Sequence, residues 1–448
     1  MRKTTFKVLT VAMASMLALT ACSKSEDKPA ASSPAGTNSP SATTGTAAAG
    51  KPTKVVFWTF NELHSKYYQG MAEKWNKQHP EKPIEFEGNV FPYDDEHNKL
   101  LVALQTGVGA PDMADIEISK FANYLKGTPQ LVPLNDIIEP EMKNLVKSRF
   151  DIYAKDGKYY GIDYHVGASV IYYNKEILDK AGVNPDNIKT WDDFRTAGKT
   201  VLEKTGKPMT TVEATEQWSM WPLIAQQDSD LLGKDGSVTL DSEKNIKTMT
   251  YLQNLVKDKI AVPAPGGFHH AEEYYAFMNK GGAASIWMPM WYMGRFTDYM
   301  PELKGKIVIK PMPAWEAGGA RSAGMGGTGT VITQQSKVQD VMKQFLAYAK
   351  LSKEGAIEIW KQLGFDPIRS DVWNDPALKE KNKFTEYFGE NIFDTLNTVK
   401  DEIKPVNIGE KTPAIIDAVK RSAEFKIIND LEDPAKVLKA VAEEVRKQ

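Results

Sequence analysis

Cysteine is nearly absent from this sequence of 448 residues, in which Cys22 is the only one. A single thiol can form neither an intrachain disulfide nor a thiolate metal cluster. An excess of charge of one sign is also absent, because 56 Lys and Arg stand against 58 Asp and Glu, a formal net charge of −2. This balance argues against a nucleic-acid-binding protein, which carries a basic excess. The mean hydropathy of −0.42 excludes a polytopic membrane protein.

Common catalytic motifs are missing as well: the sequence has no HExxH, no GxSxG and no GxxxxGK. Of the six histidines, only His269 and His270 are adjacent, and a solvated turn explains such a pair better than a metal site does. The stretch Gly324–Gly329 matches GxGxxG, but Thr330–Thr333 after it has the pattern of a strand and not of the helix that a dinucleotide site requires. We therefore expect a tight turn here, and we expect neither a cofactor nor a metal ion.

The N-terminal segment has the features of an export signal. Arg2, Lys3 and Lys7 precede an apolar run that ends in Leu19-Thr20-Ala21-Cys22, which resembles the lipobox of bacterial lipoproteins. The resemblance implies a signal peptide at residues 1–21 and acylation of Cys22, with palmitate-type chains anchoring the protein to the cell membrane. An ordinary signal peptide followed by an incidental cysteine is the alternative. Of residues 23–52, 24 are Ser, Ala, Thr, Pro or Gly, which predicts that 22–52 form the anchor and a disordered tether.

From residue 53 onwards, strand and helix patterns alternate, which predicts an α/β fold. Predicted strands at 54–60, 83–88 and 113–118 are separated by helices that end near Gln78 and Thr106. This βαβαβ opening predicts a largely parallel sheet with helices on both faces. Further along, the patterns predict an extended run over 160–173, a helix capped by Thr190, and an amphipathic helix over 338–349. At this length, two lobes are expected.

Tryptophan is abundant, with ten residues, and several follow predicted strands. Ligands of open α/β sheets bind beyond the carboxyl ends of the strands, and an indole face can cover the apolar face of a pyranose. The candidates by this criterion are Trp58, Trp218, Trp221, Trp287 and Trp291, whereas helical spacing assigns Trp75, Trp191 and Trp360 to the core. Asp115 and Glu117 face the same side of a strand end. A glycosidase also places two acids beside a sugar, so this pair leaves enzyme and binding protein open.

Several stretches, in their order along the chain, resemble segments of the extracellular solute-binding proteins of ABC sugar importers. Those most similar to the maltodextrin-binding type are Ala110–Asp112, Ile171–Lys175, Trp221–Ala225 and Lys280–Ile286. The region 305–333, including Met312-Pro-Ala-Trp-Glu316, is more similar to relatives that serve arabinose-type or lactose-type oligosaccharides. The resemblance covers nearly the whole chain after the tether.

This resemblance implies a two-lobed periplasmic-binding-protein-like fold of type II, with a hinge and a ligand cleft between the lobes. The N-terminal lobe would comprise 53–166 and 328–371, and the C-terminal lobe 167–327 and 372–448. Expected hinge segments lie near 163–167, 326–329 and 370–373. The protein would be a monomer and not an enzyme. It would capture a sugar or oligosaccharide outside the cytoplasm and deliver it to the permease subunits of an ABC transporter.

The resemblance also suggests residues that bind the ligand. By position, Glu216 and Trp218 are similar to a sugar-binding acid and aromatic residue of the second lobe, and Trp291 to a stacking tryptophan. Ile116 and Ser119 stand where the maltodextrin-binding type has a stacking Trp and an acid, so Asp115 and Glu117 are expected to take the first-lobe role. The full set is Trp58, Glu62, His64, Asp115, Glu117, Asp163, His165, Glu216, Trp218, Trp287, Trp291 and Asp366. Receptors for a peptide, a polyamine or a metal, and a surface glycosidase, are the alternatives.

Overall fold

The computed structural model describes residues 50–448. The predicted signal peptide, Cys22 and nearly all of the predicted tether lie outside the described residues. Within 50–448, none of the helices combines the length and the apolar character that crossing a membrane requires.

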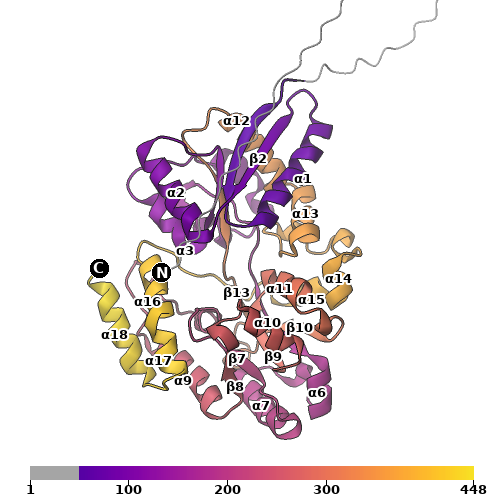
Figure 1. Ribbon diagram of the computed structural model, residues 1–448, viewed down its shortest axis with the longest axis vertical. Coiled ribbons are helices and arrows are strands. Elements are labelled where there is room, and N and C mark those ends of the chain that lie inside the picture. The colour runs from indigo at the N-terminus through magenta and orange to yellow at the C-terminus, as the bar shows by residue number, and fades with distance from the viewer. Residues whose placement is uncertain (1–49) are drawn as a thin grey trace, which may run out of the picture. The chain divides into compact units, whose positions relative to one another are not determined.

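The first lobe is built on a four-stranded sheet in the order β12-β3-β1-β2 (Figure 1). Strands β1 (Thr53–Thr59), β2 (Ile84–Val90) and β3 (Met113–Glu117) run parallel, and β12 (Thr328–Ile332) pairs with β3 in the antiparallel direction. The predicted βαβαβ opening is thereby confirmed. Because β12 returns from a distant part of the sequence, the first lobe is made of two chain segments.

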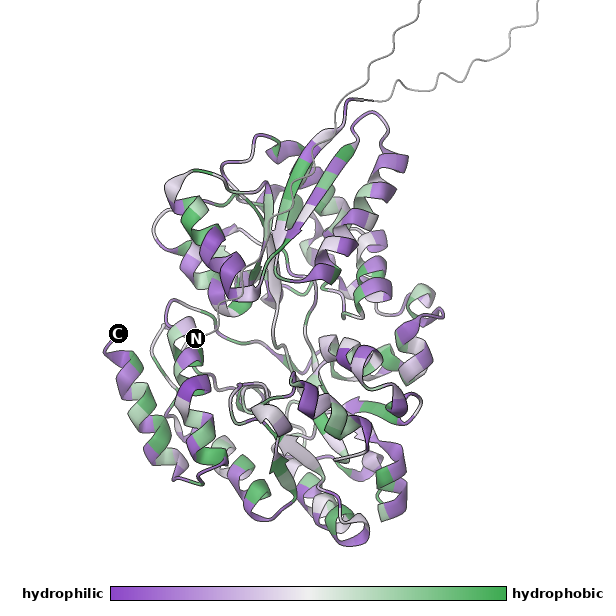
Figure 2. Ribbon diagram, in the orientation of Figure 1, coloured by the Kyte–Doolittle hydropathy of each residue, from purple (hydrophilic) through white to green (hydrophobic). Residues whose placement is uncertain are grey.

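Helices cover both faces of this sheet, as the sequence predicts. Alternate residues of a strand point to opposite faces. Phe57 of β1 packs on one face with α1 (Glu62–Gln78), α12 (Gln339–Leu346) and α13 (Lys353–Leu363). Trp58 packs on the other face with α2 (Tyr93–Thr106). In Figure 2, the strands of this sheet carry hydrophobic residues with hydrophilic ones between them.

The second lobe contains a three-stranded sheet in the order β10-β6-β9, in which both pairs are antiparallel. Its strands are β6 (Ser169–Asn174), β9 (Ser285–Pro289) and β10 (Ile307–Pro311). The largely parallel character predicted from the opening strands thus stops at the first lobe. Long excursions of the chain, and not single crossover helices, link the second-lobe strands, and such excursions allow either direction.

The remaining elements complete the two lobes around these sheets. Two-stranded pairs are β4 (Ala154–Lys155) with β5 (Lys158–Tyr159), β7 (Thr210–Val212) with β8 (Ala261–Pro263), and β11 (Ser322–Ala323) with β13 (Ile403–Lys404). The other helices are α3 (Ile118–Phe121), α4 (Asn135–Ile138), α5 (Ser148–Asp151), α6 (Lys175–Ala181), α7 (Trp191–Thr205), α8 (Trp221–Ala225), α9 (Glu243–Lys257), α10 (Glu272–Asn279), α11 (Met293–Tyr299), α14 (Lys383–Phe388), α15 (Ile392–Val399), α16 (Thr412–Ala418), α17 (Glu424–Ile428) and α18 (Pro434–Arg446).

Local predictions are met to different degrees. Thr190 and Asp193 form the expected capping box at the start of α7. The helix predicted over 338–349 changes character within its length, because α12 ends at Leu346 and a π-helical segment, Ala347–Leu351, continues it. Of the extended run predicted over 160–173, only the part from Ser169 onwards belongs to a strand. The residues before it form isolated bridges, because they cross from one lobe to the other.

The chain crosses between the lobes three times, and the crossing segments lie side by side. Isolated antiparallel bridges join Ile162 to Thr330, His165 to Pro367 and Ala168 to Gly324. The flanking side chains show where each crossing lies. The hydrophobic cores of the first lobe contain Tyr164, Val331 and Ile368. Those of the second lobe contain Val166, Met325 and Val372.

Candidate ligand-binding site

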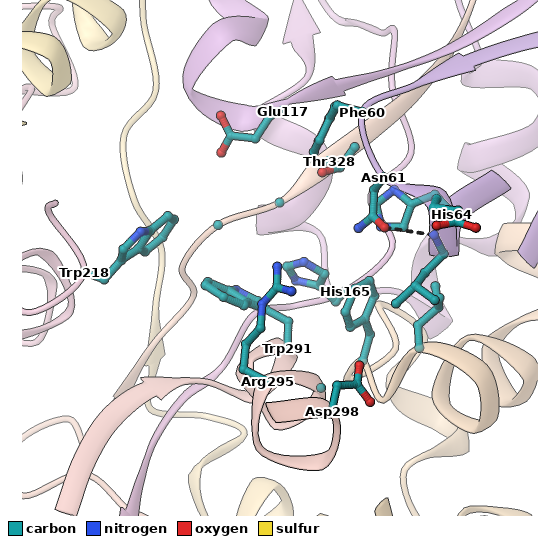
Figure 3. A pocket seen from close by; sticks show the side chains of 17 residues that line it. Phe60, Asn61, His64, Glu117, His165, Trp218, Trp291, Arg295, Asp298 and Thr328 are labelled. Carbon is teal, nitrogen blue, oxygen red and sulfur yellow. Dashed lines mark hydrogen bonds between the residues drawn. The ribbon is translucent and has the colours of Figure 1, made fainter. Parts of the chain in front are cut away.

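A pocket of about 360 Å³ is bordered by residues of both lobes and of the crossing segments (Figure 3). Its lining comes from the first turn of α1 with neighbouring first-lobe residues, the first crossing, the turn that leads into β12, the segment before α8, and the loop and helix that follow β9. The lining residues are Phe60, Asn61, Glu62, Leu63, His64, Glu117, His165, Trp218, Trp291, Gly294, Arg295, Asp298, Gly326, Gly327, Thr328, Leu363 and Phe365.

The second-lobe wall of the pocket is aromatic. Trp218 and Trp291 meet edge to face, with ring centroids 5.3 Å apart and planes at 78°. The indole N–H of Trp291 donates to the carbonyl of Met325 at 3.1 Å, which fixes the ring against the crossing segment. His270 stacks on Trp291 at 5.6 Å. Burial lowers the pKa of His270 to about 3, so this ring is neutral.

The turn between these indoles and β12 requires glycine. Gly326 has φ +67°, and a Cβ atom there would lie 2.9 Å from the indole nitrogen of Trp291. Gly327 has φ +146°, and a Cβ atom there would collide with Arg149 and Asp163. The GxGxxG match therefore leads into strand β12, as the sequence predicts, and its glycines let backbone pass close to side chains.

The first-lobe wall is built around the start of α1 and carries polar groups among apolar side chains, which are Phe60, Leu63, Leu363 and Phe365. Asn61 caps this helix, since its side-chain oxygen accepts from the backbone N–H of Leu63 at 3.0 Å. Glu62 forms an exposed pair with Lys66 at 2.8 Å. Glu117, at the end of β3, accepts from the hydroxyl of Tyr93 at 2.9 Å. Burial raises the pKa of Glu117, and its hydrogen bonds partly offset that rise.

Beneath the first-lobe wall lies Asp115, which is fully buried. Its carboxylate accepts from the hydroxyls of Thr59 at 2.9 Å, Thr330 at 2.7 Å and Tyr164 at 3.2 Å, and His64 Nδ1 lies 2.8 Å away. The ring of His64 stacks on Tyr164 at 4.1 Å. This network joins four segments of the first lobe under the pocket.

Two further carboxylates hold the crossing segments together. Asp163 pairs with the buried Arg149, and it accepts from the hydroxyl of Tyr153 at 2.7 Å. Burial alone would raise the pKa of Asp163, but Arg149 and the hydrogen bonds lower it below the ordinary value. Asp366 accepts from the backbone N–H groups of Gly167 at 3.2 Å and Ala168 at 2.8 Å. With no cation in direct contact, burial raises the pKa of Asp366 to about 7.

The sequence pattern of a known family, described as bacterial extracellular solute-binding protein, matches residues 61–356. The chain belongs to this family. The architecture agrees, because this solute-binding protein can be superimposed on the sugar-binding protein MalE from Xanthomonas citri with a TM-score of 0.74. That match is 18% identical and covers 88% of this chain and 97% of the other. An ABC substrate-binding protein from Listeria monocytogenes, solved in complex with cycloalternan, gives a TM-score of 0.71 at 21% identity, over 89% of this chain and 99% of the other. The two-lobed fold predicted from the resemblance is thereby confirmed.

Much greater sequence similarity links this solute-binding protein to two curated relatives. The arabinooligosaccharide-binding protein of Halalkalibacterium halodurans is 51% identical over 364 residues, which cover 81% of this chain and 82% of the relative. The arabinooligosaccharide-binding protein of Bacillus subtilis is 48% identical over 400 residues, which cover 88% and 92%. The resemblance found in the sequence is confirmed at the level of the family.

The pocket brings together six of the residues suggested by the sequence. They are Glu62, His64, Glu117, His165, Trp218 and Trp291. Three others, Asp115, Asp163 and Asp366, are fully buried behind the pocket in the networks described above. Sequence position alone does not separate a side chain at the pocket surface from one just beneath it.

Three more suggested residues lie elsewhere. The ring of Trp58 packs against Phe91 and under the ammonium group of Lys99, which lies 4.7 Å from its centroid. Trp287 is in the second-lobe core, where its N–H donates to the carbonyl of Ser219 at 2.9 Å. Glu216 pairs with Lys420 at 2.7 Å, outside the pocket lining.

Other lining residues escaped the sequence reasoning, above all Phe60, Asn61, Arg295, Asp298 and Phe365. Arg295 had a usable signal, because it stands four residues after Trp291 and hence on the same helical face. Phe60 and Asn61 lie in the turn between β1 and α1, where loops at strand ends carry ligand contacts. Phe365 had no local signal, because its place depends on the third crossing.

Metal ligation finds no support in the part of the chain that the structure describes. No group of three or more His, Cys, Asp or Glu side chains in residues 50–448 is arranged to hold a metal ion. Of the adjacent histidines, His269 is buried with its Nε2 2.9 Å from the hydroxyl of Thr211, and His270 stacks on Trp291. The expectation that this pair lies on a solvated turn is therefore wrong.

Proposed function

We propose that this protein captures an arabinose-type oligosaccharide outside the cytoplasm and delivers it to the permease of an ABC importer. The observation that carries the proposal is the pair Trp218 and Trp291, whose edge-to-face rings form one wall of a pocket with polar groups on the opposite wall. Sugars present apolar faces and hydroxyl edges, so such a pocket suits them. The names of the two most similar relatives reported above support arabinose-type oligosaccharides as the ligand class.

Within this proposal, the direct contacts come from the six suggested residues that line the pocket, together with Arg295 and Asp298. Trp218 and Trp291 stack on sugar rings. Glu62 and Glu117 accept hydrogen bonds from hydroxyls as carboxylates. Asp115, Asp163 and Asp366 support the site from beneath, and Trp58, Trp287 and Glu216 have no direct role.

We also propose that the lobes comprise 53–166 with 328–371 and 167–327 with 372–448, that the three crossings act as a hinge, and that the protein works as a monomer. The three side-by-side crossing segments support the hinge. Binding then closes the lobes around the sugar without chemical change.

Isothermal calorimetry with arabinotriose, and with maltotriose as the comparison sugar, tests the ligand class. We expect arabinotriose to bind and to be recovered intact, and maltotriose to bind at least tenfold more weakly. Tight binding of maltotriose alone would reject the arabinose-type ligand. The release of reducing ends from arabinotriose would instead identify a glycosidase.

The proposed lipid anchor has its own test. Cys22 is the only cysteine and ends the lipobox-like stretch, so Cys22→Ser removes the acylation site. We expect the variant to appear in the medium or to remain unprocessed, as measured by fractionation and mass spectrometry of the N-terminus. Ser23→Ala, which leaves the thiol in place, is the matched control. A Cys22→Ser protein that is still cleaved and membrane-bound contradicts the anchor.

A further inference from the structure

His64 is the one lining residue whose buried partners define which of its nitrogens carries a hydrogen. Its Nδ1 lies 2.8 Å from Asp115 Oδ2. Its Nε2 is buried and has no hydrogen-bond partner among residues 50–448. An unpartnered buried nitrogen in the wall of a pocket is costly unless something binds to it.

The hydrogen bonds around Asp115 fix the direction of each donor. Thr330 has one hydroxyl hydrogen, and it donates to Asp115 at 2.7 Å. The same oxygen accepts from Tyr68 at 3.0 Å and from the ammonium group of Lys350 at 3.2 Å, so its capacity is used. Since Thr59 and Tyr164 also donate to Asp115, the carboxylate acts as an acceptor on every side. His64 must therefore donate to it from Nδ1.

A buried lysine adjoins the same network. Lys350 Nζ lies 3.2 Å from the hydroxyl of Thr330 and over the ring of Tyr164. Burial lowers the pKa of Lys350 well below its ordinary value, and the carboxylates of Asp115 and Asp163 offset only part of that fall. Lys350 contacts the network through Thr330, so the tautomer of His64 depends on Asp115, which faces Nδ1 directly.

We propose that His64 presents Nε2 as a hydrogen-bond acceptor to a ligand hydroxyl, and that Asp115 is the positioning residue that holds this tautomer. Phe60 and Phe365 flank the imidazole edge to face, and both line the pocket, so a ligand hydroxyl reaches the buried Nε2 when these two rings move apart. The inference rests on the proposed function only in requiring a ligand with hydroxyl groups. It makes His64 selective for a hydroxyl hydrogen, which a methyl ether at the same position lacks.

Nitrogen-15 NMR of the protein labelled at histidine tests the tautomer directly. We expect His64 to carry hydrogen on Nδ1 and not on Nε2, and its Nε2 resonance to shift when arabinotriose is added. His97 is an internal reference for the same tautomer, because its Nδ1 lies 2.7 Å from the carbonyl of Tyr93 and its Nε2 accepts from the N–H of Glu117 at 3.0 Å. A spectrum with hydrogen on His64 Nε2 overturns the inference.

Calorimetry with arabinotriose on two variants tests the contact and its support. His64→Ala should weaken binding about tenfold, the value of one hydrogen bond. Asp115→Asn should weaken it at least as much, because an amide N–H facing Nδ1 moves the imidazole hydrogen to Nε2. Should Asp115→Asn fail to fold, the wild-type spectra and the affinity of His64→Ala still decide the inference.

The outcomes separate this inference from the proposed function. If the wild type binds arabinotriose and His64→Ala binds it equally well, the inference is wrong and the sugar-binding function stands. If the wild type binds no sugar, the proposed function fails, while the spectrum of the free protein still decides the tautomer.

Discussion

The two walls of the pocket differ in how their side chains are supported. On the second-lobe side, Trp218 and Trp291 are half-buried, and the main polar tie of Trp291 is one hydrogen bond to Met325. On the first-lobe side, the exposed start of α1 lies over a buried network centred on Asp115. The second-lobe wall offers two large indole surfaces, and the first-lobe wall offers hydrogen bonds whose direction is fixed from beneath.

Because of this difference, the two walls are expected to contribute differently to ligand affinity, ligand selectivity and protein stability. Apolar area contributes to binding in proportion to what is covered, and it discriminates weakly between similar sugars. A hydrogen bond with fixed direction contributes less binding free energy than a large apolar contact does. It discriminates more strongly, because a ligand that cannot form it leaves a buried polar group without a partner. We therefore expect changes at the tryptophans to alter affinity alone, and changes at the buried carboxylates to alter the free energy of unfolding.

Asp163→Ala should have the largest effect of all. It leaves the buried guanidinium of Arg149 without its partner, and removing one member of a buried pair costs about 3–5 kcal/mol of stability. Urea denaturation measures this loss. Asp151→Ala is the control, because its pair with Lys147 is exposed and should contribute below about 1 kcal/mol. Equal effects of the two changes would show that the crossing does not depend on this pair.

Asp366 should make stability fall with rising pH. Its pKa of about 7 in the folded protein lies above the ordinary value of 3.8, so the folded state holds the proton more tightly than the unfolded chain does. The stabilisation is complete below about pH 4 and is lost as pH rises to 7, by a few kcal/mol at most. In Asp366→Asn this dependence should disappear. Thermal unfolding of the wild type and of Asp366→Asn from pH 4 to pH 8 measures this dependence. If the melting temperatures of the two proteins change in parallel with pH, the raised pKa of Asp366 is contradicted.

Trp291→Ala should weaken sugar binding about tenfold to a hundredfold, because it removes a stacking surface from the second-lobe wall. Calorimetry measures the affinity, and the melting temperature without ligand shows whether the fold survives. Trp315→Ala is the matched control, since this half-buried indole lies outside the pocket lining. A large loss of melting temperature in Trp291→Ala would assign that indole to the core instead.

Thr190→Ala should have the smallest effect and should leave affinity unchanged. Thr190 caps α7 in the second lobe, away from the pocket, and loss of such a cap costs about 1 kcal/mol. Thr190→Ser keeps a hydroxyl at the cap and should retain most of that stability. A change in sugar affinity in Thr190→Ala would mean that the walls are coupled to distant parts of the lobe.

The sequence predicted the first lobe well because its signals are local. The strands over 53–59 and 113–117 and the helices between them follow from apolar patterns and breakers in adjacent residues. The antiparallel sheet of the second lobe was not predicted, because β6, β9 and β10 pair across more than 100 residues of chain. Periodicity carries no information about such pairing.

The candidate site shows the same limit at the level of single residues. Trp287 and Trp291 stand four positions apart, yet one is in the core and the other lines the pocket. Trp287 belongs to strand β9, whereas Trp291 lies in the short 3-10 helix Met290–Tyr292 that follows the strand, and this change of structure decides the outcome. The spacing of Asp115 and Glu117 correctly predicted that both side chains face the same side of the strand. It did not show that Asp115 is buried beneath the pocket, whereas Glu117 lines it.

The position of β1 has a mechanical consequence. The chain enters the first-lobe sheet through this strand, which lies between β2 and β3 and pairs with β2 over seven consecutive residues. A pull on residue 50 along the strand loads these parallel hydrogen bonds in shear, so that they share the force and do not open one after another. Tension applied at residue 50 therefore enters the protein through the central pairing of the first-lobe sheet.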